Sequence, residues 1–409
     1  MNGPMNGVRV VEAGWFASAP SCATILADWG AQVIKLEPPG GEPGRATLAR
    51  SGPSNAPLAN PRFDVHNRSR RSVVLNLLEP GPRRVAHQLV RGCDVFVTNL
   101  RPSVLRQIEL DSATLRADHP RLIYAHVTGY GDDQVGQRRS YDLGAFWAYS
   151  GLASLSGDAT GRPPHPATGM GDRAGGAALA GAVSAALFQR ERTGEGTVVT
   201  VSLLRTAMWL MASDVADALH RDDRPYPTVH ETTPKATLNC YRCADGRWIW
   251  LQVLFPARDW YLLLDVLDAH WLDEDPRFHG GEPTRLAQHS EILVETLEEI
   301  FRHRTAAEWA KRLAAAGLPF TPVQNLPEAL ADPVVHASGA FLDIPLGTGT
   351  YRSVNSPVDF AGADLPASHT APQVGADTEQ VLTELGLSPA QIAEIRATEH
   401  VHGPATTLD

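Results

Sequence analysis

The stretch V-R-V-V-E-A-G-W-F-A-S-A-P-S-C-A-T-I-L-A-D-W-G-A-Q-V-I-K-L-E, Val8–Glu37, contains one complete strand–helix–strand pattern. Val8–Glu12 has the apolar run of a short buried strand, and Gln32–Glu37 has the run of a second strand. Between them, apolar residues from Cys22 to Trp29 recur at helical spacing. Such a unit implies a right-handed parallel crossover, so we predict an α/β protein.

The alternation continues, with further strands predicted at Ser72–Leu77, Asp94–Thr98, Leu122–Val127 and Thr197–Leu203. The turn after the first strand, Ala13–Pro20, lacks the G-x-G-x-x-G pattern of dinucleotide-binding folds. This absence disfavours a role for Glu37 as a ribose-binding acid, although its position at the end of the second strand suits one.

The net charge of -10 over 409 residues argues against nucleic acid as the main partner. We see no apolar run long enough to span a membrane and no basic-then-apolar leader, so we expect a cytoplasmic location. Cys240 and Cys243 form a C-x-x-C pair without a second pair, so we expect two residues of a half-buried sheet edge and no metal site.

Two polar, proline-containing segments divide the chain. We predict that residues 1–221 form the N-terminal part of a large domain, 222–234 a linker, and 235–325 a small domain. Residues 326–409 are then a linker and the C-terminal part of the large domain, with one late helix at Asp377–Leu385. The last ten or so residues are expected to be frayed.

The stretch G-M-G-D-R-A-G-G, Gly169–Gly176, carries a single carboxylate, Asp172, just before an alanine-rich helical run at Ala177–Leu187. A carboxylate beside a helix N-terminus stays ionised and can attack an electrophile. The alternative is that Asp172 only caps the helix. From this window alone, capping is the commoner role.

Several arginines follow predicted strands or precede them within the first third of the chain. Ligands of open α/β sheets bind at the carboxyl ends of strands, and the guanidinium fork matches phosphate oxygens. A single arginine in an acidic protein is usually solvated surface, but together the set predicts phosphate binding: Arg68, Arg70, Arg71, Arg101, Arg106, Arg138 and Arg139.

Taken together, the blocks of this chain resemble those of the class III CoA-transferases, the formyl-CoA and carnitine CoA-transferase group that includes the α-methylacyl-CoA racemases. The resemblance covers nearly the whole chain. It rests on Val8–Gly41, N-R-S-R-R-S-V-V-L-N-L (Asn67–Leu77), V-T-N-L-R-P-S-V-L (Val97–Leu105), Pro120–Gly131, Y-D-L (Tyr141–Leu143), G-D-R-A-G-G (Gly171–Gly176), R-T-G-E-G (Arg192–Gly196) and Thr378–Leu387.

The resemblance implies a Rossmann-like large domain built from both chain ends, a small α+β middle domain, and a homodimer of two interlocked chains. It implies that coenzyme A enters as acyl-CoA, that a carboxylic acid is the acceptor, and that no metal takes part. Asp172 matches the family's nucleophile, which forms an acyl anhydride and then an aspartyl-CoA thioester. Asp142, next to Tyr141, matches a second acidic position of the active site.

The resemblance also places the CoA contacts. Trp15, Phe16, Ala17 and Ser18 occupy the turn that meets the pantetheine, and the positions that line the CoA site match Arg70, Arg71, Asn99, Leu100 and Arg139. Gln107 stands where an arginine for the CoA phosphates is usual, with Arg106 as its neighbour and Arg101 at the end of the preceding strand. Ala17 replaces a glutamine of formyl-CoA transferase, and His230–Pro234 replaces its glycine-rich loop, which disfavours a formyl-CoA/oxalate enzyme.

Two other functions stay open. A racemase of the family carries a histidine before the second acid, but Tyr141 stands here and is a poor base at neutral pH. A non-catalytic CoA-binding protein is the third hypothesis. Four aromatic residues flank the predicted site in sequence and indicate an apolar acyl pocket: Trp15, Phe16, Phe146 and Trp147. The alternative for Phe146 and Trp147 is the core of a helix after Asp142. His126 alternates within an apolar strand and is interpreted as structural.

Overall fold

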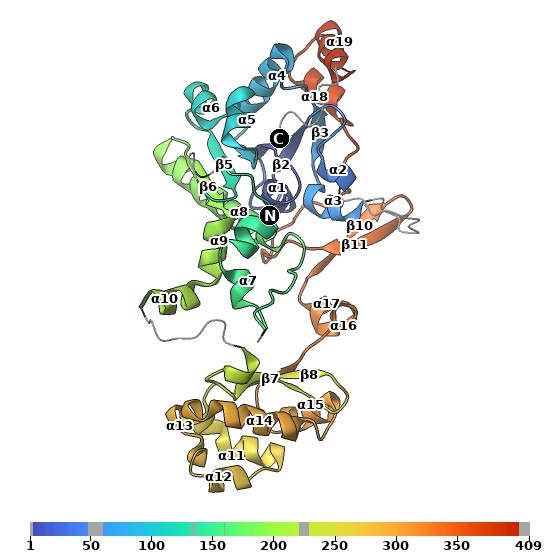
Figure 1. Ribbon diagram of the computed structural model, residues 1–409. Coiled ribbons are helices and arrows are strands. Elements are labelled where there is room, and N and C mark those ends of the chain that lie inside the picture. The colour runs from blue at the N-terminus through green and yellow to red at the C-terminus, as the bar shows by residue number, and fades with distance from the viewer. Residues whose placement is uncertain are drawn as a thin grey trace. The chain divides into compact units, whose positions relative to one another are not determined.

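The computed structural model describes residues 3–47, 60–131, 135, 137–158, 160–220 and 229–400. The chain forms two compact units, one from residues 1–153, 165–222 and 339–409, the other from 154–164 and 223–338 (Figure 1). The larger unit therefore uses both ends of the chain. Residues 326–338, which we expected to form a linker and the start of the C-terminal part of the large domain, group with the smaller unit. Most of the predicted linker at 222–234 lies outside the described residues, as does the predicted frayed end beyond residue 400.

The larger unit is built on one six-stranded sheet in the order β3-β2-β1-β4-β5-β6. All five strand pairs are parallel. The strands are β1 (Arg9–Ala13), β2 (Gln32–Glu37), β3 (Arg71–Val74), β4 (Val95–Thr98), β5 (Ile123–Thr128) and β6 (Val198–Ser202). The strand order reverses between β1 and β4, and sheets of this kind bind ligands outside the carboxyl ends of the strands at such a point.

Alternate residues of each strand enter two separate cores, because successive side chains of a strand point to opposite faces. Val10 packs with helices α1 (Ser18–Asp28) and α8 (Met170–Thr193) on one face. Val11 packs on the other face with α4 (Pro80–Arg91), α5 (Pro102–Gln107), α6 (Ser112–Asp118), α18 (Thr378–Glu384) and α19 (Pro389–Ala397). Both faces are covered, which is the usual state of a parallel sheet (Figure 1).

Helix α8 packs closely on α1 through Gly176. A Cβ at Gly176 would lie 2.7 Å from Cβ of Ser21 and 2.8 Å from the carbonyl oxygen of Ser18. The last glycine of the G-D-R-A-G-G stretch therefore allows the two helices to pack closely. Further helices of this unit are α2 (Gly44–Thr47), α3 (Pro61–Asn67), α9 (Leu203–Leu210), α10 (Ala212–His220), a π-helical turn at Leu143–Ala148 and a 3-10 turn at Thr398–His400. Helix α7 (Leu152–Leu155) has its first two residues in this unit and its last two in the smaller one.

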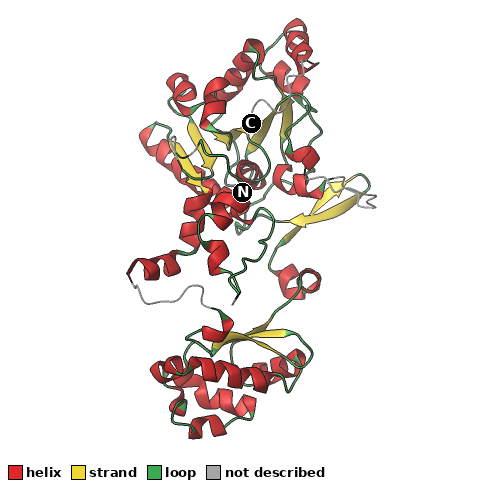
Figure 2. Ribbon diagram, in the orientation of Figure 1, coloured by secondary structure: helices red, strands yellow, loops and turns green. Residues whose placement is uncertain are grey.

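The smaller unit packs helices against a three-stranded antiparallel sheet, β7-β8-β9 (Figure 2). Its core holds the buried rings of Trp260, Trp309 and Phe301. Its elements are β7 (Leu238–Arg242), β8 (Trp248–Gln252), α11 (Pro256–Leu267), α12 (Trp271–Glu274), α13 (Pro283–Gln288), α14 (Ser290–Phe301), α15 (Ala306–Ala315), β9 (Phe320–Pro322), α16 (Leu326–Ala331) and α17 (Pro333–Ala337).

The C-x-x-C pair lies at the edge of this small sheet. Cys240 is half-buried on the edge strand β7, and Cys243 is buried directly after it. The prediction of two side chains at a half-buried sheet edge is confirmed. Within the described part of the chain, no group of three or more His, Cys, Asp or Glu side chains is placed to hold a metal ion.

The C-terminal part returns to the larger unit as a hairpin, β10 (Phe341–Leu346) and β11 (Gly349–Val354), followed by α18 and α19. Helix α18 matches the predicted late helix within one residue at each end. The expectation of a single late helix was wrong, because α19 follows. Its signal was present as the capping box of Ser388 and Gln391, in which each side chain bonds the other's backbone N–H.

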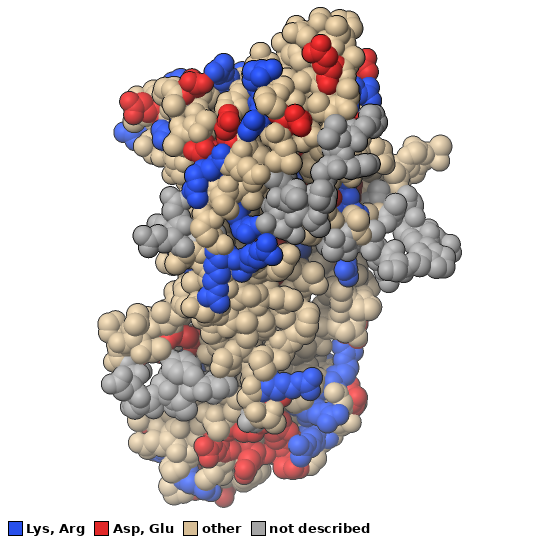
Figure 3. Space-filling model, turned by 45° about the horizontal axis from the view of Figure 1, so that its top comes forward, with Lys and Arg blue, Asp and Glu red and all other residues tan. Residues whose placement is uncertain are grey.

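The described helices include none that is both long and apolar enough to cross a membrane. On the face in Figure 3, basic and acidic side chains are intermixed.

Candidate active site

A cavity of about 280 Å³ lies in the larger unit at the carboxyl ends of β1, β4 and β5. This is the edge where the reversal of strand order predicts a ligand site. Eleven of the residues singled out in the sequence line it: Trp15, Phe16, Ala17, Ser18, Asn99, Leu100, Arg101, Arg139, Tyr141, Asp142 and Asp172. Segments that are up to about 150 positions apart in the chain therefore meet around one hollow.

Asp172 enters this cavity from the first turn of α8. The helix begins at Met170, seven residues earlier than the apolar run at Ala177 indicated. Its N-cap is Gly169, which has a left-handed φ of 68° and makes no side-chain cap. The interpretation of Asp172 as an N-cap is therefore wrong: it is the third residue of the helix, and its carboxylate is available for another role.

The carboxylate of Asp172 is half-buried and, among the described residues, has no hydrogen-bond or ion-pair partner. Burial, together with the nearby charge of Asp142, raises its pKa to about 7, while Arg173 opposes the rise. The expectation that this carboxylate stays ionised therefore does not hold below about pH 7. A carboxyl group that titrates near neutral pH at the wall of a cavity is a functional-site signal. It combines a usable ionised fraction with the higher basicity that favours nucleophilic attack.

Asp142 is the buried partner acid and stands just before the π-helical turn. Burial raises its pKa, and hydrogen bonding from the backbone N–H groups of Gly171 and Asp172 opposes that rise. A Cβ at Gly171 would lie 2.3 Å from Oδ1 of Asp142 and 2.2 Å from Cγ of Phe146, so only glycine fits there.

The turn between β1 and α1 forms the opposite wall and is held by two side chains distant in sequence. Oδ1 of Asn99 accepts from the backbone N–H of Trp15 at 2.9 Å, and Nδ2 of Asn99 donates to the Trp15 carbonyl at 2.8 Å and to Oγ of Ser18 at 2.9 Å. The N–H of Phe16 donates to Oε2 of Glu42 at 2.8 Å. These bonds hold Phe16 at a φ of 63°, which non-glycine residues rarely adopt.

Glu42 belongs to a buried cluster of charges behind this turn. Nζ of Lys35 lies 3.2 Å from Oε1 of Glu42 and 3.1 Å from Oε2 of Glu12, and it donates to the Gly14 carbonyl at 2.9 Å. Arg70 completes the cluster: its guanidinium pairs with Glu12 at 2.9 Å and donates to Oγ1 of Thr24. Buried charges of this kind are tolerated only when they are mutually paired.

Three predicted CoA contacts do not line this cavity. Arg70 is buried in the charge cluster, so its guanidinium braces the turn from behind. Arg71 is the first residue of β3 and lines a different cavity at the amino ends of the strands. Arg106 lies on α5 outside the set of lining residues. The strand direction explains the difference for Arg71. As the first residue of β3 it lies at the amino end of the strand, whereas the Asp172 cavity lies at the carboxyl ends.

Arg138 lines the cavity, although we named it only as a general phosphate-binding candidate. Its guanidinium carbon lies 4.4 Å from the ring centre of Tyr130 and 4.6 Å from that of Tyr149, within the range of cation–π attraction. His126 also lines the cavity, and its Nε2 lies 2.9 Å from the Leu100 carbonyl oxygen. In the sequence, only the position of His126 near the end of a predicted strand indicated that it would line the cavity.

The aromatic candidates separate into wall and core. Tyr141 is 72% exposed, and its ring meets that of Phe16 edge-on with centres 6.2 Å apart. Phe146 is fully buried in the core beneath α8, and Trp147 packs against that core. Phe146 is therefore a core residue, and neither Phe146 nor Trp147 lines the cavity. Its apolar wall is formed by Trp15 and Phe16.

The parallel sheet, covered by helices on both faces, makes this an α/β protein. A half-buried carboxylate at the carboxyl ends of its strands is typical of a catalytic site. The chain matches the model of CoA-transferase family III over residues 5–378. It belongs to CoA-transferase family III and is an enzyme of that class. The motif blocks that suggested the family are thereby confirmed.

Two curated relatives are similar over nearly their full length. The chain is 31% identical to the (R)-2-hydroxy-4-methylpentanoate CoA-transferase of Clostridioides difficile, covering 97% of this chain and 99% of the relative. It is 29% identical to the cinnamoyl-CoA:phenyllactate CoA-transferase of Clostridium sporogenes, covering 97% of each. A crystal structure of a mutant of Rv3272 from Mycobacterium tuberculosis superposes with a TM-score of 0.81 at 28% identity, covering 93% and 99% of the two chains.

Proposed function

We propose that this enzyme moves CoA from an acyl-CoA to a free carboxylic acid through a covalent intermediate on Asp172. The observation that carries the proposal is the half-buried Asp172 carboxylate at the cavity wall, with a pKa of about 7 and, among the described residues, no bonding partner. The relatives named above are CoA-transferases, which supports this reaction class.

The chemistry begins when an Asp172 carboxylate oxygen attacks the thioester carbonyl carbon. The C–S bond breaks, and the products are an acyl-aspartyl anhydride and CoA thiolate. The thiolate attacks the aspartyl carbonyl, which releases the donor acid and leaves an aspartyl-CoA thioester. An acceptor carboxylate then attacks the aspartyl carbonyl of this thioester, the C–S bond breaks, and a second acyl-aspartyl anhydride and CoA thiolate form. The thiolate attacks the acyl carbonyl of this anhydride, which gives the new acyl-CoA. Asp172 is regenerated, and no ATP is needed because each intermediate keeps the activation of the thioester.

Asp142 acts through position and charge. The backbone N–H groups of the first turn of α8 favour its ionised form, and its negative charge helps to raise the pKa of Asp172. We assign it this supporting role and assign Tyr141 a contact with the substrate at the rim of the cavity. The exposure of Tyr141 suits such a contact.

The CoA moiety is proposed to lie along the turn at Trp15–Ser18, with its phosphates near Arg101, Arg138 and Arg139. All three arginines line the Asp172 cavity. Arg70 is left out of this set because its guanidinium is buried against Glu12. The apolar rings of Trp15 and Phe16 suit an acyl chain rather than a formyl group. We also propose that the acceptor is a 2-hydroxy acid, because the acids named for both curated relatives belong to that class.

A homodimer of interlocked chains is part of the proposal and rests on the family resemblance. It is consistent with large apolar side chains that are exposed on α8 to α10, among them Trp209 at 79% and Leu219 at 73%. Light scattering on the purified chain tests it: a single-chain mass at micromolar concentration would overturn the dimer. The cytoplasmic location stays a prediction.

The test of the chemistry is mass spectrometry of the protein after incubation with a panel of acyl-CoAs, with hydroxylamine trapping. We expect an acyl- or CoA-derived adduct on the Asp172 peptide, and no adduct in Asp172→Asn. An unchanged adduct and full turnover in Asp172→Asn would overturn the proposal. Asp118→Asn, at an exposed carboxylate that pairs with Arg91, is the matched control.

The same samples test the racemase alternative. Deuterium that enters the α-carbon of an acyl-CoA without any acceptor acid would indicate an isomerase. The curated relatives do not favour that outcome, since they carry CoA-transferase names.

A further inference from the structure

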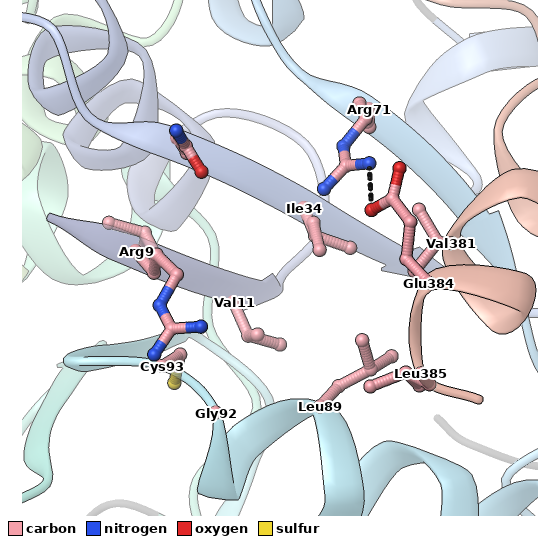
Figure 4. Close-up of a pocket in the computed structure, with 12 residues that line it drawn as sticks. Arg9, Val11, Ile34, Arg71, Leu89, Gly92, Cys93, Val381, Glu384 and Leu385 are labelled. Atoms are coloured by element: carbon pink, nitrogen blue, oxygen red, sulfur yellow. Dashed lines mark hydrogen bonds and ion pairs between the residues drawn. The ribbon is translucent and has the colours of Figure 1, made fainter. Parts of the chain in front are cut away.

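A second cavity, of about 160 Å³, lies at the opposite edge of the six-stranded sheet from Asp172. Arg9, Gln32 and Arg71 are the first residues of β1, β2 and β3, and all three line it. Because these strands are parallel, their first residues lie at one edge. Helices α4 and α18 supply the other side (Figure 4).

The two arginines of this cavity differ in their partners. Nη1 of Arg71 lies 2.7 Å from Oε2 of Glu384 on α18, so this guanidinium already holds a carboxylate. The guanidinium of Arg9 makes no hydrogen bond or ion pair with any residue in the described part of the chain, whereas its backbone N–H and carbonyl both bond to Asp94. In Figure 4 the Arg9 and Arg71 guanidinium groups approach the hollow from two sides.

The space between the arginines has an apolar wall. Val11 and Ile34 contribute from the sheet, Leu89 from α4, Val381 from α18, and Leu385 from the position directly after α18. A cation beside an apolar wall matches a molecule with an anionic head and a short hydrocarbon tail. A volume of about 160 Å³ corresponds to roughly five water molecules, which suits an acid of about four to six carbons.

We propose that this cavity binds a small aliphatic monocarboxylate, with the carboxylate on Arg9 and the tail against Val11, Leu89 and Leu385. The site goes beyond the proposed CoA transfer and does not depend on it, since it uses no residue of the Asp172 cavity. A guanidinium binds a carboxylate through paired charge-assisted hydrogen bonds, while the small buried area limits the affinity. We expect a dissociation constant on the order of millimolar.

The experiment is a calorimetric titration of the full chain with butanoate, once alone and once in the presence of saturating CoA, which under the proposed function occupies the Asp172 cavity. Butanamide, the neutral analogue, is titrated in parallel. Arg9→Ala should weaken butanoate binding about tenfold, because it removes a charged hydrogen-bond donor. Glu384→Gln should tighten it severalfold, because the Arg71 guanidinium loses its internal carboxylate.

Arg242→Ala is the matched control, since Arg242 is likewise an exposed arginine at the end of a strand, in the smaller unit. It should bind butanoate as the unmodified chain does. Thermal melting of each variant checks that the fold is kept. Opposite shifts in Arg9→Ala and Glu384→Gln would support the site, and general loosening of the structure does not produce them.

Three results would overturn the proposal: no heat from butanoate at tens of millimolar, equal binding of butanamide, or unchanged affinity in Arg9→Ala. The readout is binding, so failure here leaves the adduct experiment on Asp172 unaffected. Equally, butanoate binding can be measured in this titration even if the protein has no transferase activity.

Discussion

The backbone N–H of Phe16 donates a 2.8 Å hydrogen bond to the buried carboxylate of Glu42, 26 positions along the chain. The second oxygen of this carboxylate pairs with Lys35, which in turn binds the carbonyl of Gly14. The active-site turn is thus anchored to a buried charge cluster rather than to its own neighbours. Its left-handed Phe16 persists because these bonds over-determine it.

Glu42→Ala should destabilise the protein by about 3–5 kcal/mol, because it breaks a buried ion pair and leaves the Phe16 N–H unpaired. Glu42→Gln should cost less, since its amide oxygen can still accept from Phe16. Denaturant unfolding measures both. In each variant that folds, KM for acyl-CoA should rise more than kcat falls, because the turn is expected to contact CoA. Glu379→Gln, at an exposed glutamate, should change neither quantity. Equal stability of all three variants would contradict the anchoring.

Gly171→Ala should destabilise the protein by about 1–3 kcal/mol, because the added methyl group has no room between Asp142 and Phe146. Gly181→Ala is the control on the same helix, with nothing within 4 Å of its Cβ. It should stabilise the protein by about 0.5–1 kcal/mol, since alanine is the better helix former. Urea unfolding of the two variants checks the opposite signs. A stabilised Gly171→Ala would show that this contact is not tight.

Asp172→Asn should be more stable than the unmodified chain at pH 8, by on the order of 1–3 kcal/mol. The folded pKa of Asp172, about 7, lies above its unfolded value, so the folded state holds more protons and stability falls as pH rises from about 4 to 7. Below about pH 4 both states are protonated and the advantage of the variant disappears. Melting temperatures between pH 4 and pH 8 test this, and parallel curves for the two proteins would refute it.

The rate of CoA transfer should depend on pH in the opposite sense. If Asp172 attacks as a carboxylate, kcat/KM should rise with pH through an apparent pKa near 7 and then level off. Asp142→Asn removes the neighbouring charge that raises this pKa, so the rising limb should move to lower pH. Steady-state assays with one acyl-CoA across pH 5 to 8 measure both. A flat profile for the unmodified enzyme would exclude Asp172 as the group that titrates.

Local sequence patterns were sufficient for the strands of the large sheet and for the family. Val10 and Val11 enter different cores simply because side chains of a strand alternate, and the pattern of apolar residues carries that information. The order of short motif blocks identified the family and placed Asp172 and Asp142 in one site. The helix start at Met170 was missed, because glycines there hide the helical period and the contacts of α8 with α1 override their low helix propensity.

What the sequence by itself determined is the parallel sheet, the family and the acid that faces the cavity. Only the tertiary structure decided which arginines line that cavity. Arg70 is paired with Glu12, and Arg71 lines the cavity at the opposite ends of the strands. Arg138 lines the Asp172 cavity and contacts the rings of Tyr130 and Tyr149. The physical reason is the distance along the chain over which each effect acts. A strand period acts between neighbours in the chain, whereas burial, ion pairing and the pKa of Asp172 depend on groups that folding brings together from distant positions.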